Sequence, residues 1–319
     1  MFRYTKNFSV GDVSFDLESD WHLPAGNIET VDLCLADLKS NQQSDWLVLA
    51  GDLFDTEDGE DVSSEIVQLF SKIRNYKIVW YLPGNHDLRG RKDPWFSLRG
   101  LDDFGVIYPK LYGPEIIQHQ GLQVMIGNLF YDFQFIDSRI LNITPEEVLK
   151  FYREETPDGE HFLGGSTELF PIFSKIFRDH LSDQVDLVMT HAVPHPSLVT
   201  FKVAEMTHEH QEMSTKLGVP FFCDPAGDER DACRYKQTPE RSRRYWNFKS
   251  LIMGSNIFQY PNFDTKNPPK FSSFRGGLTS VFGHNHRSTD QILQINDKSV
   301  RFISHQPCPW KDHYRPGST

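Results

Sequence analysis

The chain has 319 residues, of which 38% are hydrophobic and 13% aromatic, so it can bury a substantial core. Its formal net charge of −11 disfavours an extended surface that coats nucleic acid, because phosphate binding needs clustered cations. No apolar run approaches the roughly 20 residues of a membrane span, and the N-terminus has no apolar segment like that of a signal peptide. The cysteines show no CxxC spacing and are expected to be reduced thiols. We therefore expect a soluble cytoplasmic protein.

The first 90 residues are predicted to alternate strands and helices. Alternating or continuous apolar runs indicate strands at 13–18, 46–50 and 77–82. Apolar residues spaced three or four apart indicate helices at 28–40 and 63–74. This β-α-β-α-β order predicts a parallel sheet with right-handed crossovers.

The strand predicted at 13–18 is more polar than a buried central strand should be. Asp16 and Glu18 alternate with apolar residues in it. We expect either that its polar face meets solvent or that the strand lies a few residues away from this placement.

The rest of the chain continues with shorter elements. Strands are predicted at 115–118, 122–127, 186–190, 278–282, 291–295 and 300–304, and helices at 144–152 and 166–180. Residues 194–277 form a long polar interval with several prolines and glycines and a helix near 239–253. We interpret this interval as a lid-like insertion in one α/β domain of residues 1–310, which is followed by a flexible tail at 311–319.

Side chains that can bind metal follow five of the predicted strands. They are Asp20 and His22, Asp52 and Asp55, Asn85 and His86, His191, and His284 and His286. Loops at the carboxyl ends of strands are where α/β folds keep their sites, and imidazole and carboxylate suit divalent first-row metals. The set is too large for one ion and suffices for two if one carboxylate is shared. Two such ions roughly 3.5–4 Å apart form a clamp for in-line displacement at phosphorus.

The order and spacing of these residues resemble the calcineurin-like metallophosphoesterase superfamily, whose pattern is D-x-H, GD-xx-D, GNH-D/E, a lone H and GH-x-H. The chain supplies Asp20-Trp21-His22, Gly51-Asp52-Leu53-Phe54-Asp55, Gly84-Asn85-His86-Asp87, His191 and Gly283-His284-Asn285-His286. Each block alone is weak, but the five blocks in this order across residues 13–305 are highly specific. The resemblance implies a four-layer α/β/β/α sandwich and a phosphoester hydrolase that uses a metal-activated water.

The resemblance also implies a role for each residue. The two metal ions would be held by Asp20, His22 and His286 for the first, Asn85, His191 and His284 for the second, and Asp52 as the bridge. His86 would face the substrate and stabilise the transition state or protonate the leaving oxygen, and Asp55 would orient it. Arg89 and Arg91 are either phosphate contacts or ordinary loop cations. The expected ion is Mn²⁺, with Fe, Zn or Ni as alternatives, because such sites accept each according to its availability.

Each of these residues also has a purely structural interpretation. A buried histidine such as His191 is often only a hydrogen-bonded core residue, and Asp52 can cap the following helix. Asp87 can equally be a turn residue, so it stays outside the ligand set. Five further histidines, in the 194–277 interval or near the C-terminus, are expected to be surface or packing residues: His195, His208, His210, His305 and His313.

Within the superfamily, the motifs look most like the nuclease subunit of the bacterial SbcCD complex and its DNA-repair relatives. Those nucleases carry a DNA-recognition capping domain after the last histidine motif, whereas only residues 287–319 follow His286 here. The insertion at 194–277 is an alternative lid. Its basic cluster, Arg241, Arg243 and Arg244, is either a phosphate contact or a solvated helix face.

Two other branches of the superfamily fit less well. Protein serine/threonine phosphatases usually carry Arg-Gly after the second Asp of GD-xx-D, and here Thr56-Glu57 follows Asp55. Lariat-debranching enzymes replace the first Asp with Cys, and here Asp20 is retained. We therefore predict a phosphodiesterase acting on a nucleotide or nucleic acid.

Several alternatives stay open. The chain can be a phosphomonoesterase or protein phosphatase, or a non-catalytic scaffold with the same fold. The sequence leaves open the substrate, the native metal and the oligomeric state. It also leaves open whether Cys223 and Cys233 approach each other.

Overall fold

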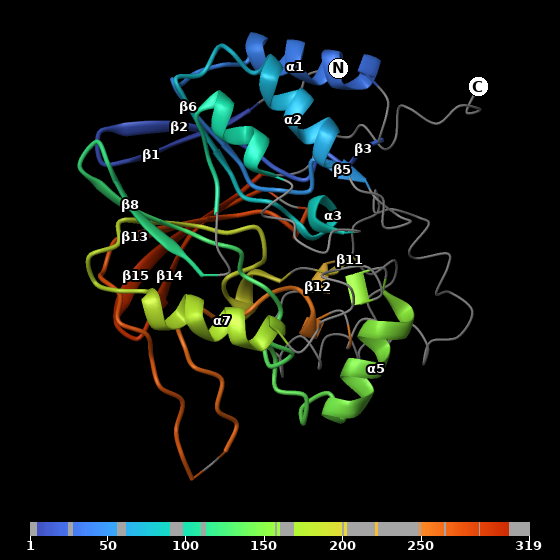
Figure 1. The fold of residues 1–319 in the computed structure, drawn as a ribbon. Coiled ribbons are helices and arrows are strands. Elements are labelled where there is room, and N and C mark those ends of the chain that lie inside the picture. The colour runs from blue at the N-terminus through green and yellow to red at the C-terminus, as the bar shows by residue number, and fades with distance from the viewer. Residues whose placement is uncertain are drawn as a thin grey trace.

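A computed structural model places two β-sheets face to face, with helices covering their outer faces (Figure 1). It describes residues 5–24, 28–55, 62–89, 98–109, 113–156, 158–159, 169–199, 201–202, 221–222, 248, 250–264, 266–286 and 288–305. This is the predicted four-layer α/β/β/α arrangement.

The first sheet has the strand order β1-β2-β4-β6-β7. Its strands are β1 (Lys6–Val10), β2 (Val13–Glu18), β4 (Trp46–Leu49), β6 (Ile78–Tyr81) and β7 (Val106–Ile107). Strands β2, β4, β6 and β7 pair in parallel. Strand β1 is an antiparallel edge strand that was not predicted from the sequence. Helices α1 (Ile28–Ser40) and α2 (Ser63–Lys72) connect the parallel strands, so the predicted β-α-β-α-β unit is confirmed.

The second sheet has the order β14-β15-β13-β10-β9-β8. Its strands are β8 (Glu115–His119), β9 (Leu122–Ile126), β10 (Leu187–Met189), β13 (Leu278–Phe282), β14 (Thr289–Ile295) and β15 (Lys298–Ser304). The four inner strands are parallel, and β8 and β14 are antiparallel edges. Helix α7 (Leu169–His180) covers the outer face of this sheet, and α5 (Pro145–Glu155) lies beside its end (Figure 1).

Short elements complete the described part of the fold. They are α3 (Asn85–Leu88), the 3₁₀ helices Leu98–Phe104 and Pro196–Leu198, the pair β3 (Leu23–Pro24) and β5 (Phe54–Asp55), and the pair β11 (Phe201–Lys202) and β12 (Phe221–Phe222). Within the described ranges, no helix is long and apolar enough to cross a membrane.

The core follows the alternation of side chains along the strands. Val48 and Trp80 point between the sheets, where they pack with residues of the second sheet such as Val281. Their neighbours Leu47 and Tyr81 point the other way, under α1 and α2. Because both faces of these strands are buried, they read as continuous apolar runs.

The polar strand at 13–18 forms where it was predicted, yet Asp16 and Glu18 are fully buried. The carboxylate of Asp16 accepts hydrogen bonds from the backbone N–H of Gln43 (2.9 Å) and Ser44 (3.1 Å) and from the hydroxyl of Tyr76 (3.0 Å). Both expected explanations, solvent exposure and a shifted strand, were therefore wrong. A buried carboxylate is tolerated here because donors surround it.

Parts of several predictions lie outside the described residues. These parts are Arg91, the basic cluster at 241–244, Cys223 and Cys233, His208, His210 and His313, and the tail at 311–319. In the helix expected near 239–253, the described residues Phe248, Ser250 and Leu251 are helical, whereas Ile252 and Met253 lie beyond its end. The boundaries of the insertion stay a prediction.

Candidate metal centre

The predicted ligands meet at one edge of the molecule because the carboxyl ends of parallel strands from both sheets converge there. The loops after β2, β4 and β6 supply Asp20, His22, Asp52 and Asn85 from the first sheet, and those after β10 and β13 supply His191, His284 and His286 from the second. Potential ligand atoms form three groups, and within each group the atoms lie within 4.8 Å of one another. The groups are Asp20, His22 and His286; His22, Asp52 and His86; and Asp52, His191 and His284.

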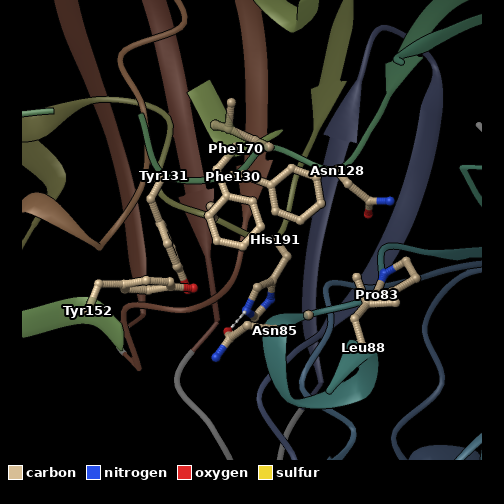
Figure 2. Close-up of a pocket in the computed structure, with 12 residues that line it drawn as sticks. Pro83, Asn85, Leu88, Asn128, Phe130, Tyr131, Tyr152, Phe170 and His191 are labelled. Carbon is tan, nitrogen blue, oxygen red and sulfur yellow. Dashed lines mark hydrogen bonds between the residues drawn. The ribbon is translucent and has the colours of Figure 1, made fainter. Parts of the chain in front are cut away.

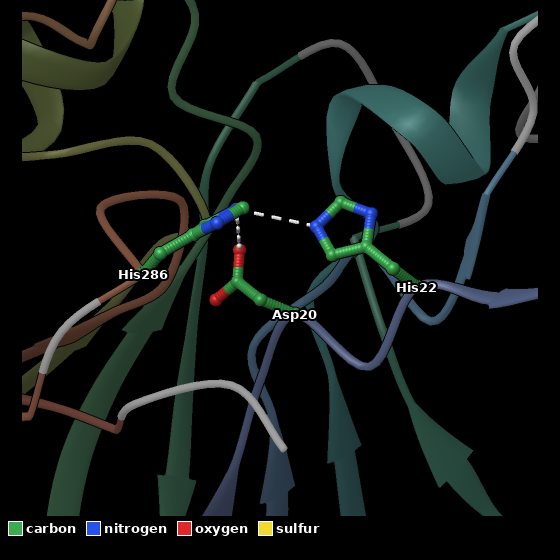
Figure 3. Close-up of side chains that lie close together, drawn as sticks. All are labelled: Asp20, His22 and His286. Carbon is green, nitrogen blue, oxygen red and sulfur yellow. Dashed lines mark hydrogen bonds and ion pairs between the residues drawn. The ribbon is translucent and has the colours of Figure 1, made fainter. Parts of the chain in front are cut away.

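The first cluster consists of Asp20, His22 and His286 (Figure 3). The Nε2 atoms of His22 and His286 are 3.2 Å apart, and His286 Nε2 is 3.5 Å from Asp20 Oδ1. Asp20 and His22 are buried, whereas the side chain of His286 is 44% exposed. The cluster therefore has one side open to solvent.

The second cluster consists of Asp52, His191 and His284, with Asn85 beside His191. The Nε2 atom of His191 is 3.1 Å from Asn85 Oδ1 and 3.3 Å from Asp52 Oδ2. The same Asp52 Oδ2 atom is 3.9 Å from His22 Nε2 of the first cluster. One carboxylate oxygen thus lies between the two clusters.

Hydrogen bonds outside the clusters orient these side chains. His191 Nδ1 is 2.7 Å from the carbonyl oxygen of Ala50, which can only accept, so Nδ1 carries the proton and Nε2 faces the cluster. Asp52 Oδ1 accepts from the backbone N–H of His86 at 2.9 Å, which leaves Oδ2 to face the histidines. The carboxylate of Asp20 accepts from the backbone N–H of His284.

The backbone of the site is strained. Positive φ angles between 49° and 65° are found at Asp20, His22, Asp52, His284 and His286. Residues with a Cβ rarely adopt this left-handed region, and it costs roughly 1–2 kcal/mol each time. Such strain clusters at functional sites, so the observed outliers support a functional interpretation of these loops.

Burial and neighbouring charges shift the pKa values of the carboxylates and of the imidazole at the site. Burial raises the pKa of Asp20 to about 7, and the charge of Asp52 adds to this. Burial opposes ionisation of Asp52 as well, but His191 and His86 hold its pKa well below the usual range. Burial opposes charging of His191, yet Asp52 raises its pKa to about 10. Metal binding requires deprotonated ligands, so a divalent cation would compete with protons for groups of raised pKa such as Asp20 and His191. The donor set therefore fits metal ions.

Asp87 connects two loops of the site. Its carboxylate is fully buried and accepts from the backbone N–H of Leu53 (2.8 Å) and of Gly84 (3.0 Å). Asp87 therefore ties the loop after β6 to the loop after β4, which agrees with leaving it outside the ligand set.

His86 lies beside the first cluster, with its ring 4.7 Å from the ring of His22 in an edge-to-face arrangement. The side chain of Asp55, which was predicted to orient His86, falls outside the described residues. Arg89 also neighbours His86, and its guanidinium nitrogens lie 3.0 Å from Nδ1 and 3.2 Å from Nε2 of the ring. Arg89 itself is 5% exposed.

Asp158 was not predicted as a site residue. Its buried carboxylate accepts from Asn85 Nδ2 (3.0 and 3.2 Å) and from Arg89 Nε (2.6 Å). Although burial opposes ionisation, Arg89 holds the pKa of Asp158 below its usual range. The surrounding Pro157-Asp158-Gly159 reads as an ordinary turn, so no local signal points to the site.

Aromatic side chains wall the second cluster on one side (Figure 2). Asn85 and His191 line a cavity of about 20 Å³ together with Phe130, Tyr131 and Tyr152. The ring of Tyr131 also lies 5.8 Å from that of His284. A cavity of this size holds about one water molecule, so the aromatic wall leaves little free space on this side of the second cluster.

Comparisons with known proteins agree with this geometry. The sequence pattern of the calcineurin-like phosphoesterases matches residues 14–223. The phosphopantetheinyl hydrolase from Mycobacterium tuberculosis has a similar structure, with 15% identity, a TM-score of 0.51, and coverage of 97% of this chain and 95% of that chain. That likeness shows a shared fold. A protein of unknown function from Aquifex aeolicus also matches, with 15% identity, coverage of 65% and 87%, and a TM-score of 0.25.

No curated protein sequence matches the chain. The family pattern covers well over half of the chain and includes the blocks that hold Asp20, Asp52, Asn85 and His191. The chain belongs to the calcineurin-like phosphoesterase family and is a metal-dependent hydrolase of phosphoester bonds.

Proposed function

We propose that the protein is a dinuclear phosphodiesterase that acts on a nucleotide or nucleic acid. The observation that carries the two-ion proposal is the position of Asp52 Oδ2, 3.9 Å from His22 Nε2 and 3.3 Å from His191 Nε2. Asp20, His22 and His286 would hold one ion, Asn85, His191 and His284 the other, and Asp52 would be shared. This donor set suits Mn²⁺, with Fe, Zn or Ni as alternatives.

Bound ions would supply a water of lowered pKa and neutralise charge on the phosphate oxygens. Two histidines of the protein would orient or assist the reacting groups. The bond from His191 Nδ1 to Ala50 keeps the other ring nitrogen available to the site. His86, whose ring lies beside that of His22 of the first cluster, would donate a proton to the leaving oxygen.

Two features favour a diester over a phosphoprotein monoester. Thr56 and Glu57 stand where protein phosphatases carry Arg-Gly. Arg89 is buried, and its Nε is committed to Asp158, so its charge is already balanced. A diester carries less negative charge than a monoester and needs fewer cations from the protein.

The test is hydrolysis of bis-p-nitrophenyl phosphate with Mn²⁺. We expect Asp52→Asn to lower turnover by more than about 100-fold, the upper range for residues that only support a ligand, and to lower the bound metal below two equivalents. Asp45→Asn is the matched control, because Asp45 is an exposed residue paired with Lys77. Full turnover by Asp52→Asn would show that the proposed centre is wrong.

A substrate panel then separates the alternatives. It compares single-stranded DNA, duplex DNA, RNA, cyclic nucleotides and phosphopeptides, and adds a phosphopantetheinyl compound because the structural neighbour is a phosphopantetheinyl hydrolase. A preference for phosphopeptides would overturn the diester proposal. Absence of bound metal after metal-replete purification would favour a scaffold.

A further inference from the structure

We propose that Asp158 is a positioning residue of the metal centre, which orients the amide of Asn85 and holds Arg89 beside His86. This inference rests on the proposed function, in which the oxygen of Asn85 is a metal ligand. Asp158 comes from the segment after α5 and lies 73 residues along the chain from Asn85, so only the fold brings them together.

The orientation of Asn85 follows from the chemistry of its two neighbours. An amide has one oxygen that accepts and one nitrogen that donates, and only the oxygen can bind a metal. The amide nitrogen lies 3.0 and 3.2 Å from the two carboxylate oxygens of Asp158, which accept hydrogen bonds when ionised. The amide oxygen is thereby directed to His191 Nε2, at 3.1 Å (Figure 2). The ionised carboxylate of Asp158 thus selects the nitrogen end of the amide for itself and leaves the oxygen end for the metal centre.

The same carboxylate also fixes Arg89. Arg89 Nε donates to Asp158 Oδ1 at 2.6 Å, and both side chains are less than 10% exposed. The guanidinium nitrogens of Arg89 then lie 3.0 and 3.2 Å from the ring nitrogens of His86. Asp158 thus acts on one predicted ligand directly and on the predicted proton donor through Arg89.

The first experiment is metal binding to Asp158→Asn. The new amide has the shape of the carboxylate, but it removes the charge opposite Arg89 and can present N–H to Asn85. We expect Mn²⁺ at one of the two sites to bind about 10–100-fold more weakly, the usual effect of losing a partner that orients a ligand. Calorimetric titration with Mn²⁺ and the metal content of the purified protein measure this independently of turnover.

Asp132→Asn is the matched control. Asp132 forms a buried ion pair with Arg178 of α7, at 2.8 Å between Oδ2 and Nη1. We expect this variant to lose thermal stability without losing metal affinity. If Asp158→Asn binds two equivalents with wild-type affinity, or if both variants lose affinity equally, the positioning role is overturned.

An exchange of the two residues supplies a rescue. The double variant Asn85→Asp with Asp158→Asn keeps a hydrogen bond between the positions and presents an oxygen to the metal from either end of residue 85. We expect it to regain the second equivalent of Mn²⁺. Should Asp158→Asn not fold, this variant alone carries the test, and failure to bind two equivalents overturns the proposal.

The wild-type protein separates this proposal from the proposed function. Fewer than two equivalents in the wild-type protein would overturn both. Two equivalents in the wild-type protein that persist unchanged in Asp158→Asn would overturn the role of Asp158 and leave the dinuclear centre intact.

Discussion

At the scale of single residues, the candidate ligands sit in a backbone conformation that their own side chains disfavour. The left-handed φ angles at Asp20, His22 and Asp52 are held by backbone hydrogen bonds between loops, such as Asp20 N to Gly51 O at 2.8 Å and His22 N to Asp52 O at 2.9 Å. The rest of the fold therefore offsets the strain. These backbone hydrogen bonds restrict the loops that carry the ligands, and such restriction lowers the entropy lost on binding.

Gly84 is the residue at which this close packing is most sensitive. A Cβ added to Gly84 would overlap Asp52 Oδ1 and approach the Asp52 backbone nitrogen. We expect Gly84→Ala to displace the shared carboxylate, lower turnover by more than about 100-fold and destabilise the fold by about 1–3 kcal/mol through overpacking. Activity assays and chemical denaturation measure the two effects.

Gly276→Ala controls for the substitution itself, because a Cβ there meets nothing within 4 Å. It is expected to retain activity and to change stability by less than about 1 kcal/mol. Equal activity in the two variants would mean that the approach of Gly84 to Asp52 has no functional role.

At the scale of elements, Asp16 holds β2 to the connection between α1 and β4. The carboxylate of Asp16 accepts hydrogen bonds from the backbone N–H groups of Gln43 and Ser44, and the N–H group of Ser44 is buried. This contact lies just before β4 begins, whereas the metal centre lies beyond the end of that strand, so Asp16 supports the fold and not the geometry of the site.

We expect Asp16→Ala to destabilise the protein by about 3 kcal/mol, because buried donors would lose their acceptor. Turnover of the folded fraction should stay close to that of the wild-type protein. Asp32→Ala is the comparison, since Asp32 forms an exposed pair with Lys72, and such pairs contribute about 0–1 kcal/mol. Urea denaturation of both variants decides the matter, and equal stabilities would contradict the role given to Asp16.

At the scale of the whole molecule, the centre joins the two sheets. Asp20, His22, Asp52 and Asn85 follow strands of the first sheet, and His191 and the His284–His286 loop follow strands of the second. The apolar interface between the sheets sets the relative position of these two groups. Metal binding should therefore stabilise the pairing of the sheets as well as the loops.

Metal removal is expected to lower the melting temperature without splitting the transition. At a metal concentration 100 times Kd, linkage adds about 2.7 kcal/mol, which raises Tm by roughly 5 °C in a chain of this size. Calorimetry with Mn²⁺ and with a chelator measures the shift. Asp52→Asn should show a much smaller shift, and a shift as large as that of the wild-type protein would contradict binding at this centre.

Much of the fold was predictable because its signals are local. Helix α1 and strands β2 and β13 have the predicted bounds, since apolar periodicity is written in neighbouring residues. The five motif blocks likewise follow directly from the residues at the strand ends. Strand β1 was not predicted because it lies at the edge of the sheet and only Phe8 among its five residues is buried. Its sequence therefore carries little apolar signal.

By itself the sequence determined the α/β class, the phosphoester chemistry and the candidate ligands. Only the tertiary structure decided how these residues meet. It showed that Asp52 Oδ2 faces both clusters, that Asp16 is buried among donors, and that Asp158 reaches Asn85 and Arg89. A contact between residues far apart in the chain leaves no periodic or spaced pattern, so only the packing of the two sheets and their loops reveals it.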